Sequence, residues 1–194
     1  AIDPMYGTMD AFDELVSEAG KRGISLILDM VCNHCSTKHE WFQRALQGDP
    51  YYRDFFIFLK GTKEGLPPTN WTSKFGGSAW GYLPRTDEYY LHLFHVSQAD
   101  LNWENPNVRR ELYDVVNFWI EKGVKGFRFD VINLISKPAI YEDDLEGDGH
   151  RFYTDGARIH EFLHELNRET FGPHEDIITV GEMASSDLPN SIRY

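Results

Sequence analysis

The chain has 194 residues, of which 41% are hydrophobic and 26% are charged, a composition that supports one compact core and differs from that of a disordered chain. Its 31 acidic side chains outnumber 19 lysines and arginines, and the formal net charge of -12 argues against nucleic acid as a partner because the phosphate backbone would be repelled. No apolar run is long enough to cross a membrane, and the first residues lack the basic and apolar regions of a signal peptide, so we expect a cytoplasmic protein with no membrane partner.

Three pairs of a helix and a strand are predicted in chain order. Thr8 is a suitable N-cap for a first helix that ends near Gly23, and Asn105, followed by a proline, begins a second helix that ends near Gly123. A third helix carries apolar residues on one face over residues 159–166. Buried strands follow these helices over residues 24–31, 124–131 and 177–182. Helices that alternate with continuous apolar strands imply an α/β fold with a parallel sheet, either open or closed into a barrel.

The segment from about residue 33 to residue 105 interrupts this alternation. It has far more residues than a connection between a strand and a helix normally needs, so we expect it to form a small inserted subdomain. Residues 88–94 have the pattern of a strand, whereas residues 65–68 and 75–78 have the composition of turns.

The two cysteines, Cys32 and Cys35, are close in sequence to His34 and His39. This spacing would fit a redox pair or a zinc site, but a structural zinc site needs two further ligands, and redox pairs usually begin a helix. We therefore expect two reduced thiols, no bound metal and no cofactor.

Polar residues are found where the predicted strands end: Asp29, Asn33 and His34 for the first strand, Arg128 and Asp130 for the second, and Glu182 for the third. In parallel α/β folds, ligands bind at the carboxyl ends of the strands, so these three endings are expected to meet at one site. Positions two apart on a strand share a face, so Arg128 should lie beside Asp130 and keep its carboxylate ionised. These residues also fit a simpler alternative, in which Arg128 and Asp130 form a structural ion pair and His34 is a buried strand-end histidine.

Asp130 and Glu182 together suit the cleavage of a glycosidic bond. That reaction needs one ionised carboxylate to attack or stabilise the sugar centre, and one protonated carboxyl group in a less polar environment to protonate the leaving oxygen. Aromatic side chains of the inserted segment could stack on sugar rings, although each is more simply explained as part of the subdomain core: Trp71, Trp80, Tyr82, Tyr89, Tyr90 and Trp103.

Four short segments resemble motifs of the α-amylase superfamily of glycoside hydrolases, and they occur in the family order. They are DMVCNH at residues 29–34, QADLN at 98–102, GFRFD at 126–130 and VGEM at 180–183. The resemblance implies an α/β fold that is a partial (β/α)8 TIM barrel, with about strands 3 to 5, their helices, and a subdomain inserted after the third strand. It divides the chain into a barrel portion at residues 1–33, the inserted subdomain at 34–104 and a second barrel portion at 105–194.

Carried over to this sequence, the resemblance implies a retaining enzyme in which Asp130 is the nucleophile and Glu182 the general acid and base, with their carboxyl groups about 5–5.5 Å apart. Arg128 would orient Asp130, and His34 would bind the sugar in the cleaved subsite. Val131 is typical of the oligo-1,6-glucosidase group, whose members act on α-1,6 and other non-1,4 linkages. Supporting structural roles fall to four further residues: Asp29, Asn33, Asp100 and Asn102.

Residues 147–167 narrow the resemblance to the trehalose-6-phosphate hydrolases, which cleave trehalose 6-phosphate to glucose and glucose 6-phosphate in bacterial cells. The expected partner is therefore a small sugar or sugar phosphate, and Lys137, His150 and Arg151 are candidate phosphate contacts. Two alternatives stay open: an oligo-1,6-glucosidase or dextran glucosidase that acts on isomaltose-type linkages, and a homologue without catalysis that binds sugars or associates with a transporter. No signal in the sequence indicates an oligomeric state.

The resemblance also implies that parts of the family site lie outside this chain. These parts are the aspartate that follows the seventh strand and the amino-terminal loop that binds calcium in some relatives. We expect the isolated chain to be nearly inactive, and the unpaired edges of its sheet to favour self-association.

Overall fold

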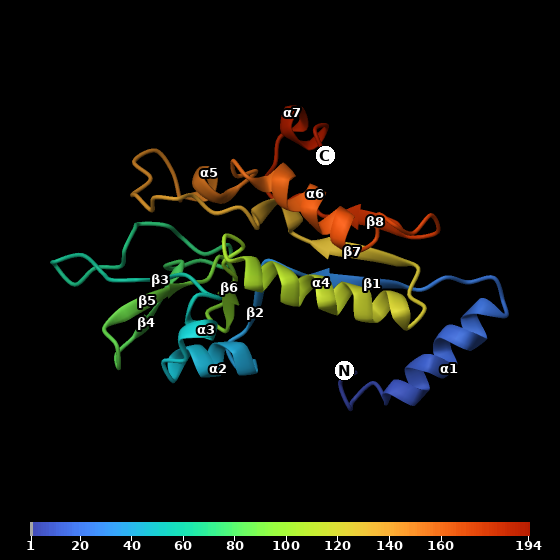
Figure 1. Ribbon diagram of the computed structural model, residues 1–194. Helices are drawn as coiled ribbons and strands as arrows, with labels where there is room; N and C mark the ends of the chain where they lie inside the picture. The colour runs from blue at the N-terminus through green and yellow to red at the C-terminus, as the bar shows by residue number, and fades with distance from the viewer. Residues whose placement is uncertain (1) are drawn as a thin grey trace.

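A parallel sheet of three strands forms the centre of the computed structural model, which describes residues 2–194 (Figure 1). The strands lie in the order β1 (Ile27–Val31), β7 (Gly126–Asp130) and β8 (Ile178–Gly181). The register sets Asp29 of β1 opposite Arg128 of β7. The prediction of an α/β fold with a parallel sheet is confirmed.

A long helix precedes each of these strands: α1 (Met9–Gly20), α4 (Pro106–Glu121) and α6 (Ile159–Glu169). The Thr8 side chain accepts a hydrogen bond from the backbone N–H of Ala11, and Asn105 caps α4 in the same way, as the sequence predicted. The apolar faces of the helices and one face of the sheet share a single core, which includes Phe12, Val116, Phe127, Phe129 and Phe162.

The ends of the first helix and strand differ from the prediction. The helix ends at Gly20 rather than near Gly23, and the strand begins at Ile27 rather than at residue 24. Gly23 has a φ of +68°, and the backbone N–H of Ile24 donates to the carbonyl of Ala19 at 3.0 Å. These residues therefore form a tight helix-ending turn, because glycine adopts this left-handed conformation at little cost.

Among residues 2–194, the apolar faces of the long helices pack on one face of the parallel sheet, and the other face is partly exposed. Successive strand residues point to opposite faces, so Phe127 and Phe129 are buried in the core while Arg128 and Asp130 project from the partly exposed face. Apolar residues on this face are 43% to 58% exposed: Ile27, Val31, Ile178 and Val180. The side chains expected to do chemistry thus lie on this partly exposed face.

The segment between β1 and α4 folds into two small antiparallel sheets beyond one end of β1 (Figure 1). In one sheet β2 pairs with β6, and in the other β5 lies between β3 and β4. We propose that this segment is the inserted subdomain, with boundaries at residues 34 and 104. Its elements are β2 (His34–Ser36), α2 (Glu40–Leu46), α3 (Pro50–Arg53), β3 (Phe58–Leu59), β4 (Trp80–Leu83), β5 (Glu88–Leu91) and β6 (Gln98–Asp100).

Most of the aromatic residues that could have stacked on sugars are part of the core. Four of them are at most 7% exposed: Trp71, Trp80, Tyr90 and Trp103. Tyr82, in contrast, is 50% exposed. Stacking on a sugar ring needs an accessible ring face, so the core explanation holds for the four buried residues.

The carboxyl-terminal half also contains three short helical elements, two before α6 and one after β8. They are the 3-10 helix η1 (Ile132–Leu134), α5 (His150–Tyr153) and α7 (Leu188–Ser191). Within residues 2–194, no helix combines the length and the apolar character that a membrane crossing requires.

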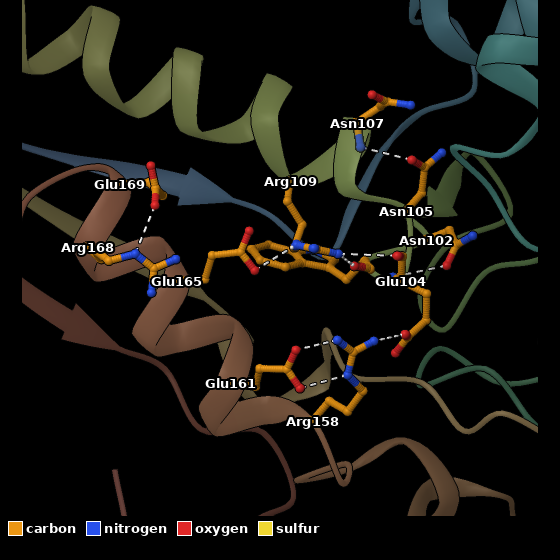
Figure 2. A network of polar contacts seen from close by, with 11 residues as sticks. Asn102, Glu104, Asn105, Asn107, Arg109, Arg158, Glu161, Glu165, Arg168 and Glu169 are labelled. Carbon is orange, nitrogen blue, oxygen red and sulfur yellow. Dashed lines mark hydrogen bonds and ion pairs between the residues drawn. The ribbon is translucent and has the colours of Figure 1, made fainter.

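A network of charged side chains joins the segment before α4 to α4 and α6 (Figure 2). Arg158 contacts both Glu104 and Glu161. Arg109 Nε lies 3.0 Å from Glu165 Oε2, and Arg109 Nη1 donates to a backbone carbonyl at 2.7 Å. The network fixes the two helices relative to the end of the inserted segment.

Candidate active site

One guanidinium group links the polar residues of all three parallel strands. Arg128 Nη1 lies 2.7 Å from Asp130 Oδ1 and 2.8 Å from Asp29 Oδ1, and Arg128 Nη2 lies 2.7 Å from Glu182 Oε2. Hydrogen bonds that Arg128 donates to the side chains of Asp29 and Asp130 raise the pKa of Arg128 above its ordinary value, so the guanidinium stays charged. The predicted contact between Arg128 and Asp130 is confirmed, and the strand ends meet at one place.

The carboxyl groups of Asp130 and Glu182 lie at the two ends of the same guanidinium fork. The sequence suggested a less polar environment for the second carboxyl group, and for Glu182 this is wrong. Its side chain is 44% exposed and forms an ion pair, because Arg128 presents two nitrogens toward the partly exposed face of the sheet. The separation of about 5–5.5 Å that a retaining mechanism requires stays a prediction.

Val131 connects the end of β7 to Glu182 through its backbone. Its φ of 40° and ψ of 42° are left-handed, a conformation that is strained for a β-branched residue. In this conformation its backbone N–H donates to Glu182 Oε2 at 3.3 Å. The Val131 side chain is 6% exposed and packs in an apolar cluster with Leu134 and Tyr153.

His34 is held by neighbours on the inserted segment. Its Nε2 lies 3.0 Å from the Gln98 side-chain amide, and its ring centroid lies 5.2 Å from that of Phe94. Burial lowers the pKa of His34 below 6.5, and this effect outweighs the opposite influence of Asp100 and Asp130. His34 is therefore a neutral imidazole at pH 7, in which one ring nitrogen donates a hydrogen bond and the other accepts one.

A buried polar cluster supports His34 from behind. Lys137 Nζ lies 2.8 Å from Asp100 Oδ2, 2.6 Å from Asn33 Oδ1 and 2.5 Å from the carbonyl oxygen of Leu134. The Asn33 amide nitrogen donates to Asp100 Oδ2 at 3.0 Å, and the backbone N–H of Leu93 donates to Asp100 Oδ1 at 2.8 Å. The cluster ties the end of β1 and strand β6 to the turn that follows β7.

This cluster overturns the suggestion that Lys137 contacts a phosphate group. The Lys137 side chain is 3% exposed and its ammonium is already surrounded by oxygens. The other two candidates are occupied as well: Arg151 Nη2 lies 2.8 Å from Asp144 Oδ1, and His150 Nδ1 lies 2.5 Å from Asp148 Oδ1. Each of these two side chains is already in direct contact with a carboxylate, which would compete with a phosphate group for the same nitrogens.

Asn102 lies apart from the guanidinium, in the loop between β6 and α4. Its amide nitrogen donates to the carbonyl of Asp54 at 3.1 Å. Its side-chain oxygen accepts from the backbone N–H of Glu104 at 3.2 Å, as Figure 2 shows. These bonds fit the supporting role that we propose for Asn102.

Two residues that the sequence analysis did not select also organise the site. Gln98 contacts His34, and Asn133 binds both the backbone N–H and the carbonyl of Ala184, two residues after Glu182, at 2.9 Å each. Gln98 could have been found, because it begins one of the four motifs. Asn133 carries no comparable signal, since its partner is 51 residues away in the sequence.

Both cysteines are free thiols, as predicted. Burial raises the pKa of Cys32 and of Cys35 to about 12, so neither is a thiolate at neutral pH. Within residues 2–194, no group of three or more His, Cys, Asp or Glu side chains is arranged to hold a metal ion.

Comparison with known proteins identifies the family. The family model for the alpha-amylase catalytic domain matches the sequence over residues 1–194. The whole chain is 58% identical to part of the trehalose-6-phosphate hydrolase of Escherichia coli (strain K12) and covers 35% of that relative. The oligo-1,6-glucosidase of Parageobacillus thermoglucosidasius is 50% identical over 97% of the chain, which covers 34% of that relative.

Solved structures agree with this comparison. The crystal structure of Bacillus licheniformis trehalose-6-phosphate hydrolase superposes with a TM-score of 0.97 at 56% identity, over 100% of this chain and 35% of that one. The chain thus spans about a third of the length of the relatives that it matches. The three-stranded parallel sheet and its helices are part of the family's TIM barrel, as predicted. The chain belongs to the alpha-amylase family, because residues 1–194 all lie within the match to that family's catalytic domain.

Proposed function

We propose that the protein is a retaining α-glucoside hydrolase that cleaves trehalose 6-phosphate into glucose and glucose 6-phosphate in the cytoplasm. The observation that carries the proposal is the position of Asp130 and Glu182 on one guanidinium, 2.7 Å from its two terminal nitrogens. Two carboxyl groups held together on the open face of a parallel sheet can act on a single acetal.

In the first step Asp130 is the nucleophile and Glu182 the acid. Asp130 attacks the anomeric carbon, the bond from that carbon to the bridging oxygen breaks, and protonated Glu182 gives its proton to the leaving oxygen. Glucose 6-phosphate leaves, and the glucosyl group stays bound to Asp130. Arg128 keeps Asp130 ionised and oriented for this attack.

In the second step Glu182 acts as a base. Its carboxylate takes a proton from water, the water oxygen attacks the anomeric carbon, and the ester to Asp130 breaks, so that glucose is released with its configuration retained. The Glu182 side chain is 44% exposed in this chain, which leaves its carboxyl group accessible to water. His34 binds the glucosyl unit, and Val131 limits the space beside the nucleophile.

The choice of substrate is supported by the relatives. The trehalose-6-phosphate hydrolases of Escherichia coli (strain K12) and Bacillus subtilis (strain 168) are 58% and 55% identical to the chain, whereas the oligo-1,6-glucosidase of Parageobacillus thermoglucosidasius is 50% identical. This last relative supports a second candidate, hydrolysis of α-1,6 linkages as in isomaltose. Val131 fits both candidates, because it is typical of enzymes that act on α-1,6 and other non-1,4 linkages.

The test uses the full-length protein that contains residues 1–194, with purified trehalose 6-phosphate and isomaltose as substrates. Asp130→Asn should lower kcat by about three orders of magnitude or more while sugar binding, followed by calorimetry, survives. Asp29→Asn is the matched control, because Asp29 also forms an ion pair with Arg128 but is not assigned to the chemistry. An Asp130→Asn protein with normal turnover would exclude the nucleophile role. A wild-type protein that cleaves isomaltose faster than trehalose 6-phosphate would favour the second candidate.

Glu182→Gln separates an enzyme from a sugar-binding homologue. Loss of the acid should slow a substrate with a poor leaving group, such as trehalose 6-phosphate, far more than p-nitrophenyl α-glucoside, whose leaving group needs no proton. A wild-type protein that binds sugars but hydrolyses neither substrate would identify a homologue without catalysis.

A further inference from the structure

Lys74 belongs to a loop that is fastened beside His34. The backbone N–H of Lys74 donates to the carbonyl of Leu93 at 2.8 Å, and the Ser73 hydroxyl donates to the carbonyl of Phe94 at 2.6 Å. Phe94 is the residue whose ring lies against His34. The loop therefore starts from the side of the site that holds the proposed glucosyl subsite.

The Lys74 side chain crosses to the side of the site that carries Glu182. Its Nζ donates to Ser185 Oγ at 2.9 Å, and it lies 5.4 Å from the ring centroid of Tyr153. Ser185 follows Glu182 by three residues, and Tyr153 packs in the same apolar cluster as Val131. Because Glu182 would protonate the leaving oxygen, a group near Ser185 lies on the leaving-group side.

Lys74 differs from the other candidate cations, whose charges are neutralised by carboxylates in direct contact. No ion pair among residues 2–194 includes Lys74, whereas Lys137, Arg151 and Arg128 each contact at least one carboxylate. Its polar partner is a hydroxyl group, which can itself donate to an anion. Partial burial lowers the pKa of Lys74 despite the opposite influence of Asp148, and a partly desolvated ammonium is attracted more strongly to an anion.

We propose that Lys74 binds the phosphate group of the leaving sugar and thereby selects phosphorylated substrates. This inference rests on the proposed function. The Lys74 ammonium forms a charge-assisted hydrogen bond to a phosphate oxygen, and the Ser185 hydroxyl, released from Lys74, donates to a second oxygen. The contact is made away from the reacting atoms, so it adds to substrate binding before and during reaction.

The test compares two substrates in the full-length protein: trehalose 6-phosphate and p-nitrophenyl α-glucoside, which has no phosphate. Lys74→Gln can still hydrogen-bond to Ser185 but lacks the charge. We expect the ratio of kcat/KM for trehalose 6-phosphate to kcat/KM for the glucoside to fall about 10- to 100-fold, mainly through KM, which is the loss typical of a charged hydrogen bond. Lys74→Arg keeps the charge and should restore most of the ratio.

Lys63→Met is the matched control, since Lys63 is an exposed lysine in the same inserted segment, and it should leave the ratio unchanged. If Lys74 were merely structural, Lys74→Gln would slow both substrates alike and the ratio would stay constant, which overturns the proposal. If the Lys74→Gln protein is unstable, Lys74→Met replaces it, and the same ratio of kcat/KM values is measured. A wild-type protein that does not cleave trehalose 6-phosphate would instead refute the proposed function.

Discussion

The buried ion pair between Lys137 and Asp100 gives the sharpest stability prediction. Lys137→Met keeps the length of the side chain but removes an ammonium with three oxygen neighbours at 2.5 to 2.8 Å. Asp100, which is 0% exposed, would keep only the amide of Asn33 and the backbone N–H of Leu93 as partners. A buried carboxylate without a cation lowers the free energy of unfolding by much more than the lost contact itself contributes.

The expected loss is about 3–5 kcal/mol in the free energy of unfolding, the range for removing one partner of a buried pair. Adding Asp100→Asn should return part of that loss, because the buried charge disappears while the side-chain oxygen still accepts from Leu93. The Asn33 amide, no longer held by Lys137, can then turn its oxygen toward the new amide. The double variant should therefore be more stable than Lys137→Met alone, a coupling that only a direct interaction produces.

The measurement is urea unfolding of the full-length protein, followed by tryptophan fluorescence. Lys122→Met is the control, since Lys122 lies 2.9 Å from Asp13 in a pair whose side chains are 32% and 46% exposed. Exposed pairs contribute about 1 kcal/mol or less, so this variant should be close to wild type. A loss for Lys137→Met as small as that of the control, or a double variant that is less stable than the single one, would refute the reasoning.

Three further measurements test other parts of the structure. Burial lowers the pKa of His34 below 6.5, so the unfolded chain binds a proton at a higher pH than the folded one. The unfolding free energy should therefore fall as the pH drops below 6.5. In urea titrations at a series of pH values, His34→Gln should reduce this dependence of the unfolding free energy on pH. Arg109→Met should lower the unfolding free energy by about 1.5–3 kcal/mol, whereas Arg158→Met, in a pair that is about 40% exposed, should cost less than about 1 kcal/mol; equal losses would contradict the difference in burial. Because burial raises the pKa of Cys32 and Cys35 to about 12, iodoacetamide at pH 8 should label them only after unfolding, and rapid labelling of the folded protein, read by mass spectrometry, would contradict this.

Much of the fold could be predicted from local pattern. Residues two apart on a strand share a face by geometry alone, which is why the contact between Arg128 and Asp130 followed from their spacing. The cap at Asn105 could also be predicted, because both of its signals are local. The side chain accepts a hydrogen bond from the first helical turn, and a proline occupies the first helical position.

Contacts between distant residues could not be predicted in the same way. Lysine is rarely buried, so nothing marked Lys137 as the centre of a cluster until the fold brought together Asn33 and Asp100, 67 residues apart. The environment of Glu182 was misjudged for a related reason. The spacing of Arg128 and Asp130 suggested an ion pair between these two residues alone. A guanidinium has two terminal nitrogens, however, and the strand order places Glu182 beside the second one.

The proposed nucleophile and acid belong to one hydrogen-bonded unit at the ends of two adjacent strands. The backbone N–H of Glu182 donates to the carbonyl of Phe129 at 2.9 Å, and its carbonyl accepts from the N–H of Ile132 at 3.2 Å. The left-handed turn at Val131 fits between these bonds and directs its own N–H at the Glu182 carboxylate. Val131 directly follows Asp130, and its N–H contacts Glu182, so the position of the Glu182 carboxyl group depends on the strained conformation of the residue next to the proposed nucleophile. Backbone strain of this kind costs about 1–3 kcal/mol and persists only where the surroundings fix it, here the cluster that buries the Val131 side chain.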